Sequence, residues 1–268
     1  MVKDFGEFIL SSNSMIKWVL TILAIIVLLF PRRANDQLPK IIWILWFQGW
    51  DKAPWLSKKC AESWKKLNPG WDVRLIDEKN CPVPIYGDTH QARSDVVRLE
   101  LLSKFGGVWA DSTMLCMQPL DSWVWKDIEP AGVWMYHGNK ECKGPASWFI
   151  VSKPGNNMMN KWVTACREYW KDRKNNDNYF WMDGLWFKLI ETDDEFKNIW
   201  EKVPHVCCED PGQSHYLAGK VSKDVTQEIK DTIEKVKPRA MKLSNHDGVD
   251  ENSKDSNAHF VINFAGVL

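Results

Sequence analysis

The apolar run at residues 41–47, Ile-Ile-Trp-Ile-Leu-Trp-Phe, is the feature that most constrains the fold of this chain. It lies between Pro39 and Gly49 and is typical of a strand buried on both faces, as in a parallel sheet. Residues 56–67 follow with helical spacing, and residues 71–76 alternate like a second strand. Strand, helix and strand in this order predict an α/β fold with a right-handed crossover.

Further along the chain, hydrophobic spacing predicts more helices and strands. Val97, Leu101 and Phe105 recur at helical spacing, and Gly106-Gly107 follows them with the residue type that ends a helix in a left-handed conformation. The expected elements are a helix at 94–105, strands at 108–110 and 147–152, helices at 158–170 and 184–191, a polar helical stretch at 219–237 and a charged loop at 245–257. These elements place residues 35–268 in one domain.

Charge and tryptophan content narrow the class of ligand. The chain has 35 Lys and Arg residues and 35 Asp and Glu residues, so it lacks the excess of positive charge that nucleic-acid binding requires. It also has 17 tryptophans, far above ordinary usage. Most of them are expected in the core, but the flat apolar face of an indole also stacks on sugars and nucleobases. The composition therefore favours a carbohydrate or nucleotide ligand.

The seven cysteines show no spacing typical of a zinc ribbon or a thioredoxin site, because no Cys-x-x-Cys pair occurs. Their number is odd, and Cys207 and Cys208 are adjacent. We interpret these two residues as reduced thiols rather than a redox pair. The set as a whole is typical of a reducing compartment.

Residues 15–30 form an apolar segment that suits a membrane. Its uncharged part spans about 20 Å, so it crosses a bilayer only if neighbouring uncharged residues join the helix and Lys17 extends to the interface. A cleaved signal peptide fits less well, since Pro31-Arg32-Arg33 stands where small residues belong. We predict a single-pass anchor within residues 1–34. The positive residues on its C-terminal side favour a cytoplasmic main domain.

Residues 92–116 hold the densest set of candidate functional side chains. Arg93 and Asp95 are expected at the start of a helix, where anions are favoured and where Arg is suited to bidentate phosphate contact. Asp111 follows the next strand at its carboxyl end, which is where open α/β sheets bind their ligands. A carboxylate at this point predicts a hard divalent cation that bridges a diphosphate.

The string Ala-Arg-Ser-Asp at 92–95, an amphipathic helix, Gly-Gly-Val and Asp111 resembles the sugar-binding region of family 32 glycosyltransferases with an Asp-x-Asp (DXD) motif. The chain is still more similar to the capsular polysaccharide synthesis protein family. That resemblance runs from about residue 38 to residue 205, through PKIIWILWFQGWDKAP, SWKKLNPGWDVRLIDEKN, the block at 93–120, SWFIV and YFWMDGLWF, and more loosely through KLS at 242–244. Several blocks in the same order argue against chance similarity.

The resemblance implies a GT-A-like fold, which is a Rossmann-like mixed sheet flanked by helices. It also implies a UDP- or GDP-sugar donor and a divalent metal, Mn²⁺ or Mg²⁺. By position, the residues expected to face the donor are Trp46, Gln48, Gly49, Arg93, Asp95 and Gly107. Asp111 is expected to hold the metal.

One position departs from the Asp-x-Asp pattern, since the motif here reads Asp111-Ser112-Thr113. The hydroxyl of Thr113 can bind Mg²⁺ or Mn²⁺, or hold a metal-bound water, but it adds no negative charge. The resemblance implies a further metal ligand from the C-terminal third of the chain. Three candidates remain open there: His246, Asp247 and His259. Lys242 is expected to neutralise the leaving diphosphate.

Residues 179–183, Tyr-Phe-Trp-Met-Asp, are the candidate acceptor wall. Aromatic faces stack on sugars, and Asp183 is suited to accept a hydroxyl proton. Asp183 is also a candidate N-cap for the helix expected to follow it.

These features predict a membrane-associated, metal-dependent glycosyltransferase that moves a hexosyl or pentosyl group to a glycan acceptor during polysaccharide or glycoprotein glycan synthesis. The resemblance implies retention of anomeric configuration. Two alternatives stay open. Asp111-Ser112-Thr113 also suits a carbohydrate- or nucleotide-sugar-binding module without turnover. A glycoside hydrolase would need two carboxylates about 5–9 Å apart, drawn from Asp95, Asp111 and Asp183.

Overall fold

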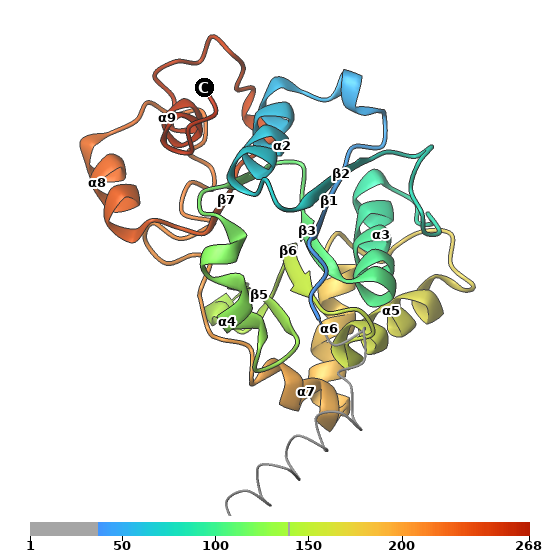
Figure 1. The fold of residues 1–268 in the computed structure, drawn as a ribbon. Helices are drawn as coiled ribbons and strands as arrows, with labels where there is room; N and C mark the ends of the chain where they lie inside the picture. Colours follow the sequence, from blue (N-terminus) through green and yellow to red (C-terminus); the bar gives the residue numbers. More distant parts are fainter. Residues whose placement is uncertain (1–36, 139) are drawn as a thin grey trace, which may run out of the picture. The chain divides into compact units, whose positions relative to one another are not determined.

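A five-stranded sheet in the order β2-β1-β3-β6-β5 forms the centre of the protein (Figure 1). Its strands are β1 Ile41–Leu45, β2 Asp72–Ile76, β3 Gly107–Ala110, β5 Val133–Gly138 and β6 Gly144–Ser152. The strand β1 pairs in parallel with β2 and β3, whereas β6 runs antiparallel to both β3 and β5. This mixed sheet with its helices confirms the α/β class.

The structure is a computed structural model that describes residues 37–138 and 140–268. The predicted anchor at 15–30 and the domain boundary after residue 34 lie outside these residues. Within the described ranges, no helix is long and apolar enough to cross a bilayer.

Two crossover helices connect the parallel strands of the sheet. The helix α2 Trp55–Leu67 connects β1 to β2, and α3 His90–Phe105 connects β2 to β3. Right-handed crossovers in opposite directions put the two helices on opposite faces of the sheet, as Figure 1 shows. The strands β2 and β3 lie on either side of β1, so the connection after β1 and the connection before β3 run in opposite directions along the sheet. That reversal makes the carboxyl ends of β1 and β3 a topological switch point.

The helix α3 begins at His90, four residues earlier than predicted. Thr89 caps it, since its side chain accepts a hydrogen bond of 3.1 Å from the backbone N–H of Ala92. Arg93 and Asp95 therefore lie inside the helix rather than at its N-terminus, and the anion argument from the helix end does not apply to them as predicted.

The glycine pair after α3 ends the helix and brings β3 against β1. Gly106 and Gly107 both have positive φ angles, of 64° and 97°. A Cβ on Gly107 would lie 2.6 Å from the carbonyl oxygen of Ile41, so this position tolerates only glycine. Gly107 is thus a packing residue between two strands.

The remaining helices are α4 Val124–Ile128, α5 Asn157–Trp170, α6 Trp181–Thr192, α7 Asp194–Trp200, α8 Gln227–Val236 and α9 Asn257–Phe264. Short 3₁₀ turns lie at Trp50–Lys52, Leu120–Ser122, Lys140–Cys142 and Asn245–Asp247. The helix predicted at 158–170 is confirmed as α5. The polar stretch at 219–237 is helical only within α8, because Thr226 caps that helix at its start. Asp183 is not an N-cap, since α6 begins two residues before it.

A second, two-stranded sheet carries the C-terminal part of the chain toward the switch point. It pairs β4 Met114–Cys116 with β7 Ala240–Lys242, and Lys242 lies opposite Met114. Leu115 and Met241 of this sheet belong to an apolar cluster with residues of α2, α8 and α9. The cluster anchors β7, so the position of Lys242 is set by packing.

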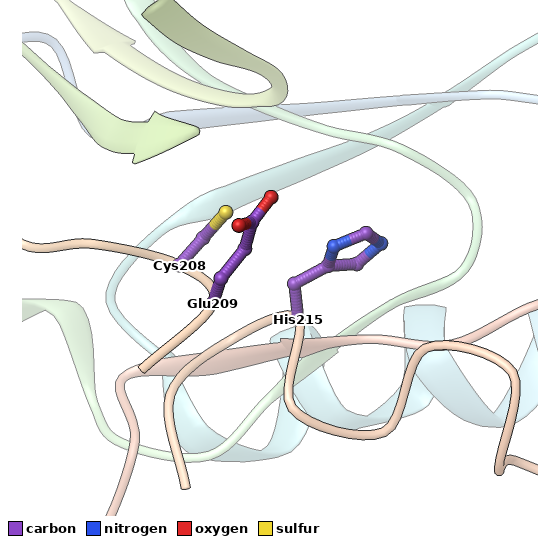
Figure 2. Close-up of side chains that lie close together, drawn as sticks. All are labelled: Cys208, Glu209 and His215. Atoms are coloured by element: carbon purple, nitrogen blue, oxygen red, sulfur yellow. The ribbon is translucent and has the colours of Figure 1, made fainter. Parts of the chain in front are cut away.

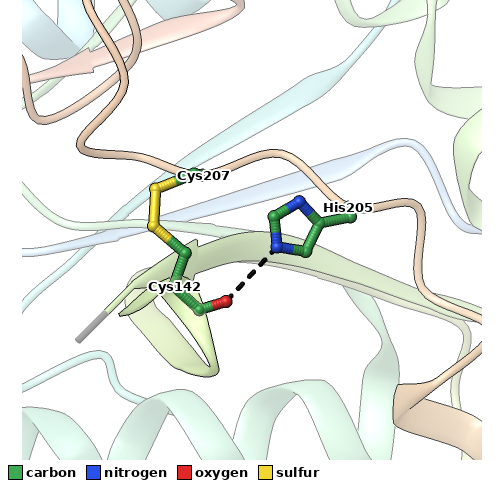
Figure 3. The surroundings of a disulfide bond; sticks show 3 residues. All are labelled: Cys142, His205 and Cys207. Atoms are coloured by element: carbon green, nitrogen blue, oxygen red, sulfur yellow. Dashed lines mark hydrogen bonds between the residues drawn. A yellow bond between two sulfur atoms is a disulfide. The ribbon is translucent and has the colours of Figure 1, made fainter. Parts of the chain in front are cut away.

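Most of the described tryptophans are buried, which confirms that they mainly build the core. The expectation that Cys207 is a reduced thiol was wrong. Cys207 forms a disulfide with Cys142, 65 residues away, beside His205 (Figure 3). Cys208 is a free thiol, as expected. Sequence spacing did not reveal the bond because its partner comes from the turn between β5 and β6.

Candidate functional site

A cavity of about 630 Å³ lies where β1 and β3 end, at the switch point of the sheet. The turns that follow both strands line it, together with α3, the β4–β7 region and the start of α6. The predicted site residues that line it are Trp46, Gln48, Asp95, Asp111, Thr113, Asp183, Lys242 and His246.

Other predicted site residues do not line this cavity. The guanidinium of Arg93 pairs with Glu78 and lies 4.8 Å from the ring centre of Phe47. His259 stacks on Trp55 at 4.8 Å between ring centres and belongs to α9, so the structure does not bring it to Asp111. Also absent from the lining are Gly49, Gly107 and Asp247.

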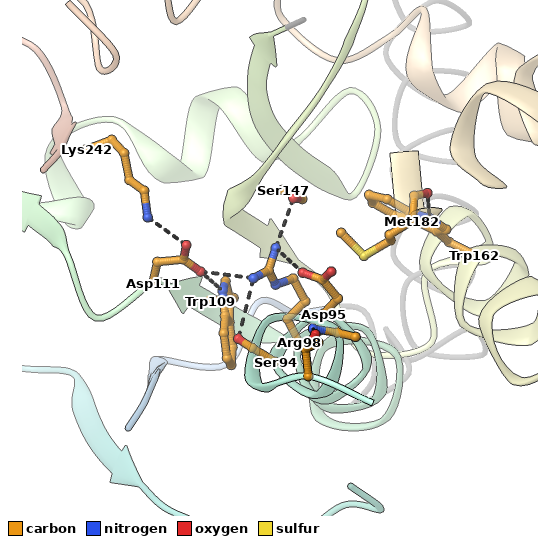
Figure 4. A network of polar contacts seen from close by, with 11 residues as sticks. Ser94, Asp95, Arg98, Trp109, Asp111, Ser147, Trp162, Met182 and Lys242 are labelled. Carbon is orange, nitrogen blue, oxygen red and sulfur yellow. Dashed lines mark hydrogen bonds and ion pairs between the residues drawn. The ribbon is translucent and has the colours of Figure 1, made fainter. Parts of the chain in front are cut away.

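Arg98 is the central cation of the cavity, and the sequence analysis missed it. Its guanidinium is buried and lies 3.1 Å from Asp95 and 3.2 Å from Asp111, while Ser147 accepts a further hydrogen bond of 2.9 Å (Figure 4). A signal was present in the sequence, because Arg98 stands three residues after Asp95 and therefore on the same helix face. A charged residue between apolar neighbours also indicates a buried, paired cation.

Asp111 is held from both sides by positive groups. One carboxylate oxygen accepts hydrogen bonds from Trp109 (2.9 Å) and Arg98 (3.2 Å), and the other accepts one from the Lys242 ammonium at 2.7 Å (Figure 4). Burial by itself would raise the pKa of Asp111. Lys242 and Arg98 outweigh burial and hold this pKa below its ordinary value. Asp111 is therefore ionised at neutral pH.

Asp95 has the opposite character although it shares Arg98 with Asp111. Burial and, to a smaller extent, the nearby negative charges of Asp111 and Asp183 outweigh the pull of Arg98 and raise the pKa of Asp95 to about 7. Near neutral pH this carboxyl group holds its proton about half of the time. It can therefore donate a hydrogen bond to a sugar hydroxyl when protonated and accept one from it when ionised.

This raised pKa predicts a dependence of stability on pH. The folded protein binds the Asp95 proton up to about pH 7, whereas an unfolded chain releases it near pH 4, so the free energy of unfolding falls as pH rises through this window. The loss is at most about 1.4 kcal/mol per pH unit. The free energy of unfolding, measured in urea, should fall less between pH 5 and pH 7 for Asp95→Asn than for the wild type. An equal fall in both proteins would contradict the raised pKa of Asp95. The exposed Asp72 provides the control, since Asp72→Asn should behave like the wild type.

The residues predicted for a metal do not fit one in this arrangement. The ammonium of Lys242 lies 2.7 Å from Asp111 and 3.0 Å from the hydroxyl of Thr113, so it occupies the position between the two predicted ligands. Both carboxylate oxygens of Asp111 accept hydrogen bonds. A divalent ion would have to displace a cation that is already bound there.

Three other residues, of types that can bind a metal ion, lie close together beside the cavity (Figure 2). The ligand atoms of Cys208, Glu209 and His215 lie within 4.8 Å of one another, and His215 also lines the cavity. Burial raises the pKa of the Cys208 thiol to about 12 and lowers that of the His215 imidazole. A metal here would have to release the thiol proton.

The rim of the cavity carries exposed aromatic rings. Tyr179 and Phe180 are 69% and 62% exposed, which is unusual for large apolar side chains. They immediately precede α6, whose Met182 and Asp183 reach the cavity lining. Aromatic faces next to a carboxylate suit a sugar ring.

Comparison with known proteins gives relatives of low identity. The chain is 27% identical over 163 residues to "Glycosyltransferase afumC" of Aspergillus fumigatus (strain CBS 144.89 / FGSC A1163 / CEA10). The matched region covers 51% of this chain and 42% of that protein. The chain is 24% identical over 163 residues to "O-glycosyltransferase braB" of Annulohypoxylon truncatum, covering 51% and 39%. The chain thus spans about two fifths of the length of these relatives.

Among solved structures, a glycosyltransferase involved in the glycosylation of the major capsid of PBCV-1 aligns over 85% of this chain and 98% of that one. The TM-score is 0.43 and the sequence identity 10%. The model of the family described as "Capsular polysaccharide synthesis protein" matches residues 25–261, which is most of the chain and includes the residues that line the cavity. The chain therefore belongs to the capsular polysaccharide synthesis protein family.

Proposed function

We propose that this protein is a glycosyltransferase that moves a sugar from a nucleotide-sugar donor to a glycan acceptor. The observation that carries the proposal is the convergence of Arg98 and Lys242 on Asp111 at the switch point of the sheet. The cavity around them, of about 630 Å³, has the size of a small-molecule site. Family membership and the glycosyltransferase names of the relatives support the same reaction. The GT-A-like form of the α/β fold stays a prediction from the family resemblance.

In this proposal, Arg98 and Lys242 stabilise the nucleoside diphosphate as it leaves. The bond between the anomeric carbon of the donor and a diphosphate oxygen breaks, and negative charge grows on the departing nucleoside diphosphate. Arg98 and Lys242 stabilise that negative charge. Fixed positive groups in a desolvated site lower the activation barrier for bond breaking most effectively. Asp111 orients both cations, since each donates a hydrogen bond to its carboxylate.

The acceptor enters from the aromatic rim. Tyr179 and Phe180 stack on the acceptor sugar, whose hydroxyl oxygen forms the new bond to the anomeric carbon. Asp183 lines the cavity and accepts the hydroxyl proton. Asp95 contacts donor hydroxyls in either protonation state. Retention of configuration, implied by the family resemblance, stays a prediction, as do the membrane anchor at 15–30 and the cytoplasmic location.

A screen of UDP- and GDP-sugars for nucleotide release tests this function. One donor should release its nucleotide slowly in water, and faster when a suitable glycan acceptor is added. Binding of a nucleotide sugar without release would instead support a binding module. Release of sugar from a glycan, without any need for a nucleotide, would support a glycoside hydrolase. If no nucleotide sugar binds and no nucleotide is released, the assignment of the cavity is contradicted.

A further inference from the structure

The ammonium of Lys242 lies where the sequence motif predicts a metal ion. The strand β7 pairs with β4 so that Lys242 is opposite Met114, next to the Asp111–Thr113 turn. From there its Nζ atom donates hydrogen bonds to Asp111 (2.7 Å) and to Thr113 (3.0 Å). The two side chains expected to ligate a divalent cation therefore both contact one ammonium group.

Two cations already supply positive charge at Asp111 without a metal. Asp111-Ser112-Thr113 carries one carboxylate fewer than an Asp-x-Asp motif, so it attracts a divalent ion less strongly. Arg98 and Lys242 together place two positive charges around Asp111, equal to the charge of one divalent ion. Adding such an ion beside them would bring like charges into contact in a partly buried site.

Lys242 also remains able to contact a ligand. Its side chain is 22% exposed and lines the cavity. An ammonium has three donors, and among the described residues only Asp111 and Thr113 accept hydrogen bonds from this one. The third donor is available to a phosphate oxygen. The apolar cluster that anchors β7 fixes the backbone from which the side chain extends.

We propose that Lys242, with Arg98, takes the place of the divalent metal, so that the protein binds the diphosphate of its donor without a metal ion. This inference rests on the proposed function, because it assumes that the cavity holds a nucleoside diphosphate. It replaces the metal dependence that the Asp-x-Asp resemblance implies.

Calorimetric titration with UDP and GDP tests the proposal on the wild-type protein, first in EDTA and then in Mn²⁺. The dissociation constant of the nucleotide that binds should differ by less than about twofold between the two conditions. Lys242→Met should weaken binding about 10- to 100-fold, the size expected for a lost charge-assisted hydrogen bond. Lys242→Arg should recover part of that loss. Lys235→Met, on the exposed side of α8, is the matched control and should bind like the wild type.

Binding that appears only in Mn²⁺, or tightens more than tenfold with it, would overturn the proposal while leaving the proposed function intact. The variants Cys208→Ser and Asp111→Asn then distinguish an ion bound at Cys208 from an ion bound at Asp111. If the Mn²⁺ effect survives in Cys208→Ser and disappears in Asp111→Asn, the metal binds at Asp111 and Lys242 does not replace it. If neither nucleotide binds in either condition, the proposed function and this inference fail together. The EDTA comparison uses wild-type protein, so it decides the question even if Lys242→Met does not fold.

Discussion

Replacing Arg98 with methionine is expected to lower the free energy of unfolding by about 3–5 kcal/mol. The Arg98 side chain is only 7% exposed, and its guanidinium pairs with both Asp95 and Asp111. Removing it leaves two nearby carboxyl groups partly buried, with Lys242 as the remaining cation at Asp111. Urea unfolding at pH 7 measures the effect. Arg98→Lys keeps the charge and should retain more stability than Arg98→Met.

Arg93→Met is the matched control for this prediction, because it removes the same group from the same helix. Arg93 pairs with Glu78, whose side chain is 57% exposed. Exposed pairs contribute at most about 1 kcal/mol. If the two methionine variants lose equal stability, Arg98 does not form the buried pair described here. Nucleotide release should also fall much further in Arg98→Met than in Arg93→Met, since only Arg98 lies in the cavity.

The variant Gly107→Ala is expected to lose more than about 4 kcal/mol of stability, or to fail to fold. A Cβ at this position would lie 2.6 Å from the carbonyl oxygen of Ile41, and the backbone has a φ of 97°. Neither the clash nor the strain can be relieved without separating β3 from β1. The yield of soluble protein and its unfolding midpoint measure the effect.

Gly155→Ala separates the clash from the backbone strain. Gly155 also has a positive φ, of 69°, but no atom lies within 4 Å of the Cβ that alanine would add. Its cost should be about 1–2 kcal/mol. If Gly107→Ala folds as stably as Gly155→Ala and loses only donor affinity, Gly107 is a donor-binding residue, as the sequence suggested, and not a packing residue.

The parallel part of the sheet could be predicted because it depends on local patterns. The apolar run that contains β1, the alternating residues of β2 and the glycine pair where α3 ends and β3 begins each mark one element. The antiparallel pairing of β6 with β3 could not be predicted in this way, since it depends on contacts between residues far apart in the sequence. The same reason explains why the bond between Cys142 and Cys207 was missed.

The candidate site was predicted in part. Gln48 and Asp111, which directly follow the apolar runs expected to form strands, both line the cavity. Arg93, which was named because it was expected at the start of a helix, does not line the cavity, whereas Arg98, which was not named, does. Helix boundaries are hard to fix from a single sequence. Lys242 was named as a cation for the leaving diphosphate. Its contact with Asp111 and Thr113 requires the pairing of β4 with β7, which no local pattern reveals.

The rate of nucleotide release from the selected donor, by wild-type protein and by Asp111→Asn, tests most directly whether this cavity carries out the transfer. This substitution keeps the shape of the side chain and removes the charge that orients Arg98 and Lys242. The rate for Asp111→Asn is expected to fall about 10²- to 10³-fold, as for the loss of one fixed electrostatic group. Asp121→Asn, at an exposed ion pair with Lys40, should release nucleotide at the wild-type rate. Equal rates for Asp111→Asn and the wild type would contradict the central claim that this cavity carries out the transfer.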